Sequence, residues 1–326
     1  MRALLIWIKM FKKKSWNEPA MTKGLIFDIQ RFCVNDGPGI RTTVFFKGCG
    51  LRCAWCHNPE SIASYRQLSY DPTRCDGCRK CFDHVDGVGI SMVDEKAEVD
   101  MNIHDQNLSL VSVCPQRCFT ILGEEKSIDE IISVILKDLD YYQESGGGVT
   151  FSGGEALNQW SFIEPLAKKL KEHNLHLTLD ISGYDPGGLL PKTFDLMDLY
   201  LLDIKAAKSE VYQKYIRQTL DPTVMLELLK SANKPVILRV PLIEDINDDS
   251  DLFDMLAKLV NAYDNIIETN LLPYHKLRKN QQFKLLNDRE FFTVADHSRK
   301  EQWKNEVRLR QIRNVTMENE LIFKKR

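Results

Sequence analysis

The feature that most constrains this chain is the placing of its cysteines. Eight of its nine cysteines fall between Cys49 and Cys118, in a sequence of 326 residues. Clustered thiols without an export signal usually bind metal or carry out redox chemistry, so we expect a cytoplasmic protein with metal sites. The apolar run Leu4–Ile8 is too short for a membrane helix and precedes three lysines, the reverse of the order in a signal peptide. We therefore expect residues 1–20 to be an extension outside the fold.

The first cysteine run, Cys49-x3-Cys53-x2-Cys56, indicates an iron–sulfur cluster with one open position. Three thiolates can hold three irons of a [4Fe–4S] cube and leave the fourth free. An open iron can chelate the amino and carboxylate groups of S-adenosylmethionine (SAM), and a reduced cluster can cleave it to a 5′-deoxyadenosyl radical. The alternative is a zinc knuckle. Zinc needs four ligands, and His57 adjoins Cys56, a spacing at which two residues seldom reach one metal.

Apolar, strand-like segments alternate with helical ones along most of the chain. We expect six strands, at Thr42–Lys47, Gly148–Phe151, His176–Ile181, Leu199–Ile204, Val236–Val240 and Ile266–Leu272. We expect helices from a capping box at Ser127 and Glu130 to about Tyr142, at Trp160–Glu172, from Asp221-Pro222 onward, and at Ser250–Ala262. Strands that alternate with helices predict an α/β fold with a parallel sheet or barrel.

Polar residues follow five consecutive strands of this prediction. They are Ser152-Gly153-Gly154-Glu155, then Asp180, then Asp203 and Lys205, then Arg239, and then His275. The carboxyl ends of parallel strands share one rim, which is where β/α barrels build active sites. The sequence therefore predicts one site at this rim, although either aspartate standing alone would be read as an ordinary strand-end cap.

Several of these segments together resemble the glycyl radical enzyme activating enzymes. The resemblance includes Gly24–Phe32, Asp36–Thr42 and His57–Glu60 beside the cysteine run, and it continues at 148–155, 179–183, 202–205 and 272–275. It covers about residues 22–275. It implies a partial (β/α)6 TIM-type barrel of the radical SAM kind, with an inserted ferredoxin-like iron–sulfur domain. We expect the barrel to comprise residues 21–61 and 124–326, and the insert residues 62–123.

The same resemblance implies roles for the rim residues. The backbone of Gly153, Gly154 and Glu155 would bind the amino group of SAM, and Lys205 would pair with its carboxylate. Asp180 and Asp203 would be the carboxylates of a monovalent-cation site. Arg239 and His275 would also face SAM. Asp36 would act as a catalytic residue, because its loop resembles the one that meets the target glycine.

The insert carries an incomplete ferredoxin pattern. Cys75-x2-Cys78-x2-Cys81 begins one run and Cys114-Pro115 ends another, while Val85, His104, Asn107 and Leu110 stand where the four other cysteines would be. In two-cluster ferredoxins the fourth cysteine of each run ligates the other cluster, so the four survivors belong to one cluster. We expect one auxiliary [4Fe–4S] cluster and one lost site, with zinc as the alternative. Cys33 and Cys118 are read as packed thiols.

The resemblance implies an enzyme of anaerobic metabolism that abstracts hydrogen from a backbone glycine of a partner glycyl radical enzyme, with flavodoxin or a ferredoxin-type protein as electron donor. Two alternatives stay open: a radical SAM enzyme acting on a small molecule, and an iron–sulfur electron carrier without catalysis. A net charge of -2 gives no field for nucleic acid or an anionic membrane. The resemblance weakens at Ile243–Asp248 and after His275, which affects the docking surface for the partner.

Overall fold

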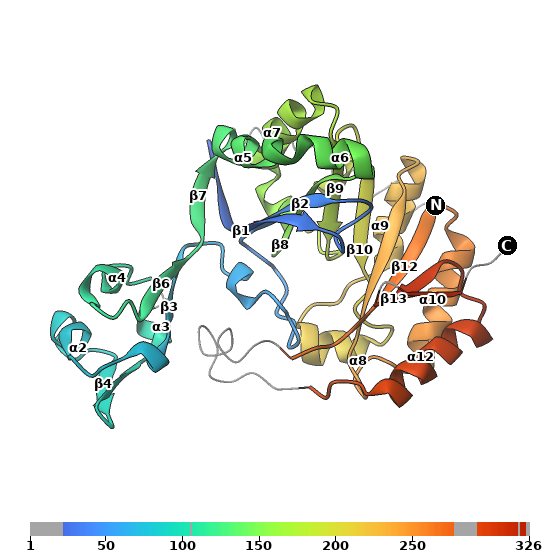
Figure 1. The fold of residues 1–326 in the computed structure, drawn as a ribbon. Coiled ribbons are helices and arrows are strands. Elements are labelled where there is room, and N and C mark those ends of the chain that lie inside the picture. The colour runs from blue at the N-terminus through green and yellow to red at the C-terminus, as the bar shows by residue number, and fades with distance from the viewer. Residues whose placement is uncertain (1–21, 105, 277–291, 319, 324–326) are drawn as a thin grey trace.

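The computed structural model describes residues 22–104, 106–276, 292–318 and 320–323, so the extension predicted at residues 1–20 lies outside the described residues. A ten-stranded sheet runs in the order β14-β13-β12-β11-β10-β9-β8-β2-β1-β7 (Figure 1). Its strands are β1 (Lys23–Cys33), β2 (Arg41–Phe46), β7 (Glu124–Ser127), β8 (Gly148–Gly153), β9 (His176–Ile181), β10 (Leu199–Asp203), β11 (Val236–Leu242), β12 (Ile266–Pro273), β13 (Val315–Met317) and β14 (Glu320–Phe323).

The six predicted strands form the parallel part of this sheet. β2, β8, β9, β10, β11 and β12 are consecutive parallel neighbours, which confirms the α/β prediction, and β13 continues the parallel pairing. β1, β7 and β14 pair antiparallel at the two edges, which the sequence reading did not predict. The short connections after β1 and β13 explain this, because a parallel crossover needs a dozen or more residues.

Helices pack along the outside of the curved sheet (Figure 1). They are α5 (Ile128–Ile135), α6 (Leu139–Ser145), α7 (Trp160–Glu172), α8 (Ser209–Val211), α9 (Pro222–Ser231), α10 (Ser250–Ala262) and α12 (His297–Leu309). α7 buries one face at helical spacing, through Phe162, Ile163, Leu166, Ala167 and Leu170. None of the helices in the described part of the chain is long and apolar enough to cross a membrane.

The helix predicted to run from Ser127 to about Tyr142 is two helices. Its capping box is present, but α5 ends at Ile135 and a 3-10 turn separates it from α6. The turn brings Asp138 inward, where it is 1% exposed and accepts a hydrogen bond from Arg31 Nε at 2.6 Å. The ion pair between Asp138 and Arg31 of β1 therefore accounts for the break between the two helices.

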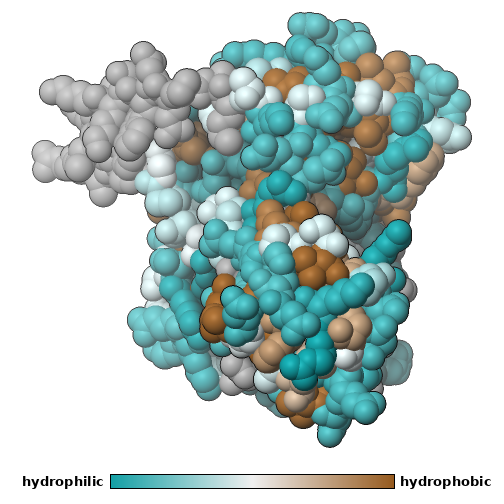
Figure 2. Space-filling view, turned by 90° about the vertical axis from the view of Figure 1, so that its left-hand side faces the viewer, coloured by the Kyte–Doolittle hydropathy of each residue, from teal (hydrophilic) through white to brown (hydrophobic). Residues whose placement is uncertain are grey.

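Between β2 and β7, residues 67–122 form a lobe beside the main sheet (Figure 1). It contains two small antiparallel pairs, β3 (Gln67–Tyr70) with β6 (Phe119–Leu122) and β4 (Ile90–Val93) with β5 (Lys96–Val99), and the short helices α2 (Lys80–His84), α3 (Met101–His104) and α4 (Leu110–Val113). Its core is separate from the main one and comprises Leu68, Tyr70, Cys81, Ile90, Ala97, Leu110, Cys118 and Phe119. The surface on this side is mostly hydrophilic, with small scattered hydrophobic patches (Figure 2).

Candidate active site

A cavity of about 640 Å³ opens at the carboxyl ends of the parallel strands. Its lining includes ten of the predicted site residues: Asp36, Cys49, Cys53, Cys56, Gly153, Gly154, Asp180, Asp203, Lys205 and Arg239. Glu155 and His275 are not among the residues that line it. The rim residues therefore come together in space, while the role of each one stays a prediction.

The cysteine loop that follows β2 is held by backbone hydrogen bonds. Cys49 N donates to Ile62 O at 3.0 Å. On the other side, Arg52 N donates to Ile216 O at 3.1 Å and Ala54 N donates to Tyr215 O at 2.8 Å. Backbone hydrogen bonds alone therefore fix the loop on both sides.

The two carbonyls that accept from this loop belong to a π-helix, Tyr212–Ile216. The carbonyls of a last helical turn have no intrahelical partner, so they are available to a neighbouring segment. π-helical turns are rare and occur frequently at functional sites. Sequence reasoning missed this element, because nothing in its composition distinguishes it from an ordinary helical turn.

Burial sets the charge state of the thiols when no metal is bound. It raises the pKa of Cys49 to about 12 and that of Cys53 to about 11. These thiols therefore stay protonated at neutral pH, and binding of iron must displace their protons. Soft thiolates facing one cavity from a single loop suit an iron–sulfur cluster. Within the described residues, no three His, Cys, Asp or Glu side chains are grouped so as to hold a single metal ion.

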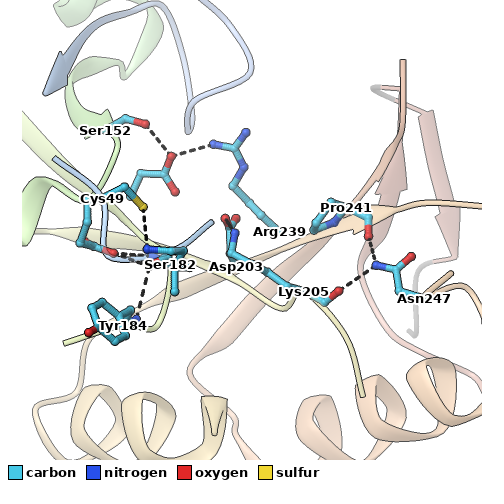
Figure 3. Close-up of polar contacts among 12 residues, drawn as sticks. Cys49, Ser152, Ser182, Tyr184, Asp203, Lys205, Arg239, Pro241 and Asn247 are labelled. Atoms are coloured by element: carbon cyan, nitrogen blue, oxygen red, sulfur yellow. Dashed lines mark hydrogen bonds and ion pairs between the residues drawn. The ribbon is translucent and has the colours of Figure 1, made fainter. Parts of the chain in front are cut away.

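Opposite the cysteines, Arg239 joins two carboxylates. Its Nη1 lies 3.1 Å from Asp180 Oδ2 and 3.6 Å from Asp36 Oδ1. Ser152 Oγ donates to the same Asp180 oxygen at 2.7 Å (Figure 3). Burial raises the pKa of Asp180 to about 6, against the opposing effect of Arg239. Sequence reasoning did not single out the hydroxyl of Ser152, although it lies in the rim motif.

Lys205 is buried beside Asp203, with its Nζ 2.6 Å from Asp203 Oδ2. Burial alone would lower the pKa of Lys205, but the carboxylate of Asp203 raises it above its usual range. Asn247 fixes the backbone here, because its Nδ2 donates to Lys205 O at 2.8 Å and to Pro241 O at 2.7 Å (Figure 3). Asn247 lies in the segment where the family resemblance is weak, which is why it was missed.

Packing requires the two glycines at the end of β8, Gly153 and Gly154. At Gly153, where φ is +116°, a Cβ would lie 2.3 Å from Phe46 N, and at Gly154 it would lie 2.7 Å from Gly48 O. The amides of Gly154 and Glu155 already donate to Phe46 O and Gly48 O. What this segment can offer an ammonium group is therefore its carbonyl oxygens.

Glu155 turns away from the cavity. Its carboxylate is 1% exposed and accepts from the backbone amide and the hydroxyl of Ser182. Burial raises the pKa of Glu155 to about 7, in spite of these hydrogen bonds. The side chain of Glu155 therefore ties the end of β8 to the end of β9, beneath the cavity.

His275 lies two residues after the end of β12. Its neighbour Tyr274, and not His275, lines the cavity. Neighbouring residues of an extended chain point to opposite sides, which accounts for this difference. The ring of His275 lies 4.2 Å from that of His57, and His57 does line the cavity. His275 is thus placed behind His57.

The Asp36–Thr42 signature is a loop braced by Arg41. This side chain is fully buried, and its guanidinium donates to Pro38 O at 3.0 Å and to Thr150 Oγ1 at 2.7 Å. Thr150 Oγ1 in turn donates to Asp36 O at 2.7 Å. Gly39 has a φ of +70°, and a Cβ there would lie 2.5 Å from Gly147 N. The arginine and glycine of the signature therefore hold the loop that carries Asp36.

In the lobe, five cysteines line one small cavity: Cys75, Cys78, Cys81, Cys114 and Cys118. Two backbone amides point at sulfur, Ala97 N at Cys75 Sγ and Cys118 N at Cys114 Sγ, both at 3.4 Å. Cys118 is 2% exposed. Cys33 is separate from the lobe and lines the cavity of about 640 Å³ at the carboxyl ends of the strands.

At the four positions where a ferredoxin would carry further cysteines, the side chains of this chain pack or hydrogen-bond within the lobe. Leu110 is fully buried in the core of the lobe, and Val85 packs against that core. His104 Nε2 lies 2.6 Å from Val88 O, and Asn107 Nδ2 lies 3.3 Å from His104 Nδ1. Apolar side chains and a hydrogen-bonded histidine therefore occupy this part of the lobe.

Comparison with known proteins identifies the class. The chain matches a family described as a 4Fe-4S single cluster domain over residues 35–219. Its fold is similar to that of a radical SAM methyltransferase from Sphaerobacter thermophilus, with a TM-score of 0.51 and 12% identity, covering 96% of this chain and 80% of that one. The chain therefore shares its fold with a radical SAM enzyme.

Sequence similarity to curated proteins identifies the family of this chain. The chain is 32% identical over 266 residues to the isethionate sulfite-lyase activating enzyme of Desulfovibrio desulfuricans, covering 78% of this chain and 84% of that one. It is 36% identical over 233 residues to the (2S)-3-sulfopropanediol dehydratase activating enzyme of Klebsiella oxytoca, covering 69% and 73%. The chain belongs to the glycyl radical enzyme activating enzymes, and the two alternative functions are set aside.

Proposed function

We propose that the Cys49–Cys53–Cys56 loop is where this activating enzyme cleaves SAM, and that the target glycine enters beside Asp36. The observation that supports this most is that the loop and the rim charges line one cavity. A [4Fe–4S] cluster and SAM, when bound, supply a 5′-deoxyadenosyl radical able to abstract hydrogen from a backbone glycine. The residues described below bind and orient the reactants.

SAM ends in a carboxylate and an ammonium group, and the cavity offers a partner for each. Lys205, kept protonated by Asp203, would bind the carboxylate. The carbonyls of Gly153 and Gly154 would accept from the ammonium, because a carbonyl oxygen is the backbone group that accepts hydrogen bonds, whereas the amides of Gly154 and Glu155 are donors. His275 would act through His57, whose ring it contacts.

A monovalent cation would complete the charge balance. Three carboxylates line the cavity, those of Asp36, Asp180 and Asp203, against the cations Lys205 and Arg239 and a third, Arg31, that is already paired with Asp138. We propose that Asp180 and Asp203 hold the cation, since the nearby charge of Asp203 raises the pKa of Asp180 and a cation between them would offset that repulsion. SAM affinity should fall when potassium and sodium are replaced by tetramethylammonium, and an equal affinity in both salts would exclude the site.

We propose that residues 62–123 are a ferredoxin-like insert in the barrel formed by 21–61 and 124–326. Its cavity would hold one auxiliary [4Fe–4S] cluster on Cys75, Cys78, Cys81 and Cys114. The amides aimed at Cys75 and Cys114 support this, because hydrogen bonds to sulfur stabilise cluster thiolates. Zinc on the same four thiols is the alternative, and metal analysis separates the two.

The partner would be a glycyl radical lyase. The relatives are named for activation of a sulfite-lyase, a decarboxylase and two dehydratases, which all break a bond to carbon by elimination or decarboxylation. Flavodoxin or a ferredoxin-type protein would supply the electron. The cavity mouth carries the solvent-exposed side chains Phe32 and Val34, which suit a protein surface.

The test is made on the full chain, reconstituted with iron and sulfide without oxygen. With SAM, reductant and a glycyl radical lyase from the same organism, the protein should form 5′-deoxyadenosine, methionine and a glycine-centred doublet in the electron paramagnetic resonance spectrum. Cys53→Ala should abolish all three, and Cys33→Ala is the matched control that should retain them. Full SAM cleavage by Cys53→Ala would overturn the site. Cleavage without the doublet would overturn the choice of a lyase partner.

A further inference from the structure

A second cavity, of about 700 Å³, lies on the other side of the cysteine loop. Its walls are the start of β1, the segment 47–52, the segment 62–67 that leads into the lobe, and the 3-10 turn at 156–159. Among the described residues, Cys49 alone lines both this cavity and the first one. Cys49 therefore lies between the two cavities. We call the cavity of about 640 Å³ the front cavity and the cavity of about 700 Å³ the rear crevice.

Among the described residues, the rear crevice has basic but no acidic side chains in its lining. The charged ones are Lys47, which is buried, and Arg52. Arg52 is exposed, and its Nη1 donates to Cys49 O at 2.7 Å. Arg66 is exposed and lies between Tyr65 and Gln67, which both line the crevice. Positive charge is thus held directly over the backbone of Cys49.

We propose that the rear crevice receives an acidic one-electron carrier protein, which reduces the cluster from the Cys49 side. This rests on the proposed role of Cys49 as a cluster ligand. In the step, the carrier is oxidised by one electron and the cluster is reduced by one electron; no bond forms and no proton moves. The front cavity is then left for SAM and the target glycine segment.

Geometry and charge favour this route over the two others. Through the front cavity, the carrier would compete with SAM and with the partner enzyme for one opening. Through the lobe, the electron would start from a cavity whose lining includes none of Cys49, Cys53 and Cys56, whereas Cys49 lines the rear crevice. A basic crevice also steers an acidic protein to it, and such steering is weakened by salt.

The test places charge on the rim of the crevice without touching the loop. Ser64 is exposed and lines the crevice, so Ser64→Glu and Ser64→Lys change its charge in opposite directions. Ser298 in α12 is exposed and lines neither cavity, which makes Ser298→Glu the matched control. The probe is a purified acidic flavodoxin, used photoreduced for the rate of cluster bleaching and oxidised for its dissociation constant by calorimetry.

At low ionic strength, Ser64→Glu should slow reduction and weaken binding about threefold to tenfold, and Ser64→Lys should do the opposite. The differences should vanish in about 0.5 M salt, and Ser298→Glu should match the wild type. Equal rates and affinities in both Ser64 variants would overturn the proposal. So would loss of reduction in Cys114→Ala with unchanged Ser64 variants, which assigns the route to the lobe. SAM cleavage driven by photoreduced 5-deazaflavin tests the proposed function separately.

Discussion

The proposed auxiliary cluster gives the sharpest prediction, because the lobe offers two candidates for one of its ligands. Cys114 and Cys118 both line its small cavity, and the amide of Cys118 donates to the sulfur of Cys114. A cysteine whose backbone bonds to a neighbouring sulfur is placed to support that ligand. We therefore expect Cys114→Ala to remove a cluster ligand and Cys118→Ala to remove a packed, buried thiol.

The magnitude follows from the number of clusters. One cluster on the Cys49 loop and one in the lobe give about eight irons per chain, whereas a complete two-cluster insert would give about twelve. Cys114→Ala should lower the content by up to about four irons, and Cys118→Ala should leave it unchanged. The site on the Cys49 loop should survive both, since its ligands lie outside the lobe. Iron and acid-labile sulfide per chain, with the Mössbauer spectrum, provide the measurement.

Three results would refute this reasoning in different ways. Iron near twelve per chain in the wild type would contradict the lost site, where Leu110 and His104 now lie. Depletion in Cys118→Ala but not in Cys114→Ala would show that the other cysteine is the ligand. Stoichiometric zinc with about four irons would make the lobe a zinc module without a redox role.

Two further predictions test residues that position the site. The pKa of Glu155 is raised by burial to about 7, so the stability it contributes is present below pH 4.5 and lost as the pH rises through 7. Glu155→Gln should remove that loss and be more stable than the wild type at pH 8 by up to about 3 kcal/mol, and parallel stability–pH curves would contradict this. Asn247→Leu removes two hydrogen bonds that fix Lys205 O and Pro241 O, so SAM affinity measured by equilibrium dialysis should fall about tenfold. An unchanged affinity would show that Asn247 does not position Lys205.

Elements with a strong period were predictable to the residue. α7, β9 and α10 have the predicted bounds, because each shows an unambiguous hydrophobic period between clear end signals. The π-helix, α12, β13 and β14 were missed. A π-turn has no compositional signal, and short edge strands carry too few residues to show alternation.

The site was predictable in its position along the chain but not in the direction of every side chain. Strand ends placed Asp180, Asp203 and Arg239 at the rim, and they do line the front cavity. Glu155 lies at the same rim, yet it is turned beneath it by Ser182. Arg41 was read as part of a signature, whereas the structure shows a buried brace whose partners are distant in sequence. Contacts of this kind depend on packing, which spacing does not encode.

β2 connects the cysteine loop with the loop that carries Asp36. β2 is buried along all six residues, and its last residues lead into the cysteine loop. Its first residue, Arg41, braces the loop before it, and its Thr43 hydroxyl donates to Asp36 Oδ2 at 2.8 Å. The side chain proposed to meet the target glycine therefore bonds to the same strand that carries the proposed cluster ligands. Because a fully buried strand is among the least mobile parts of a fold, this strand would set the proposed separation between the radical source and its target. The partner enzyme would then have to bring only its glycine segment to the site.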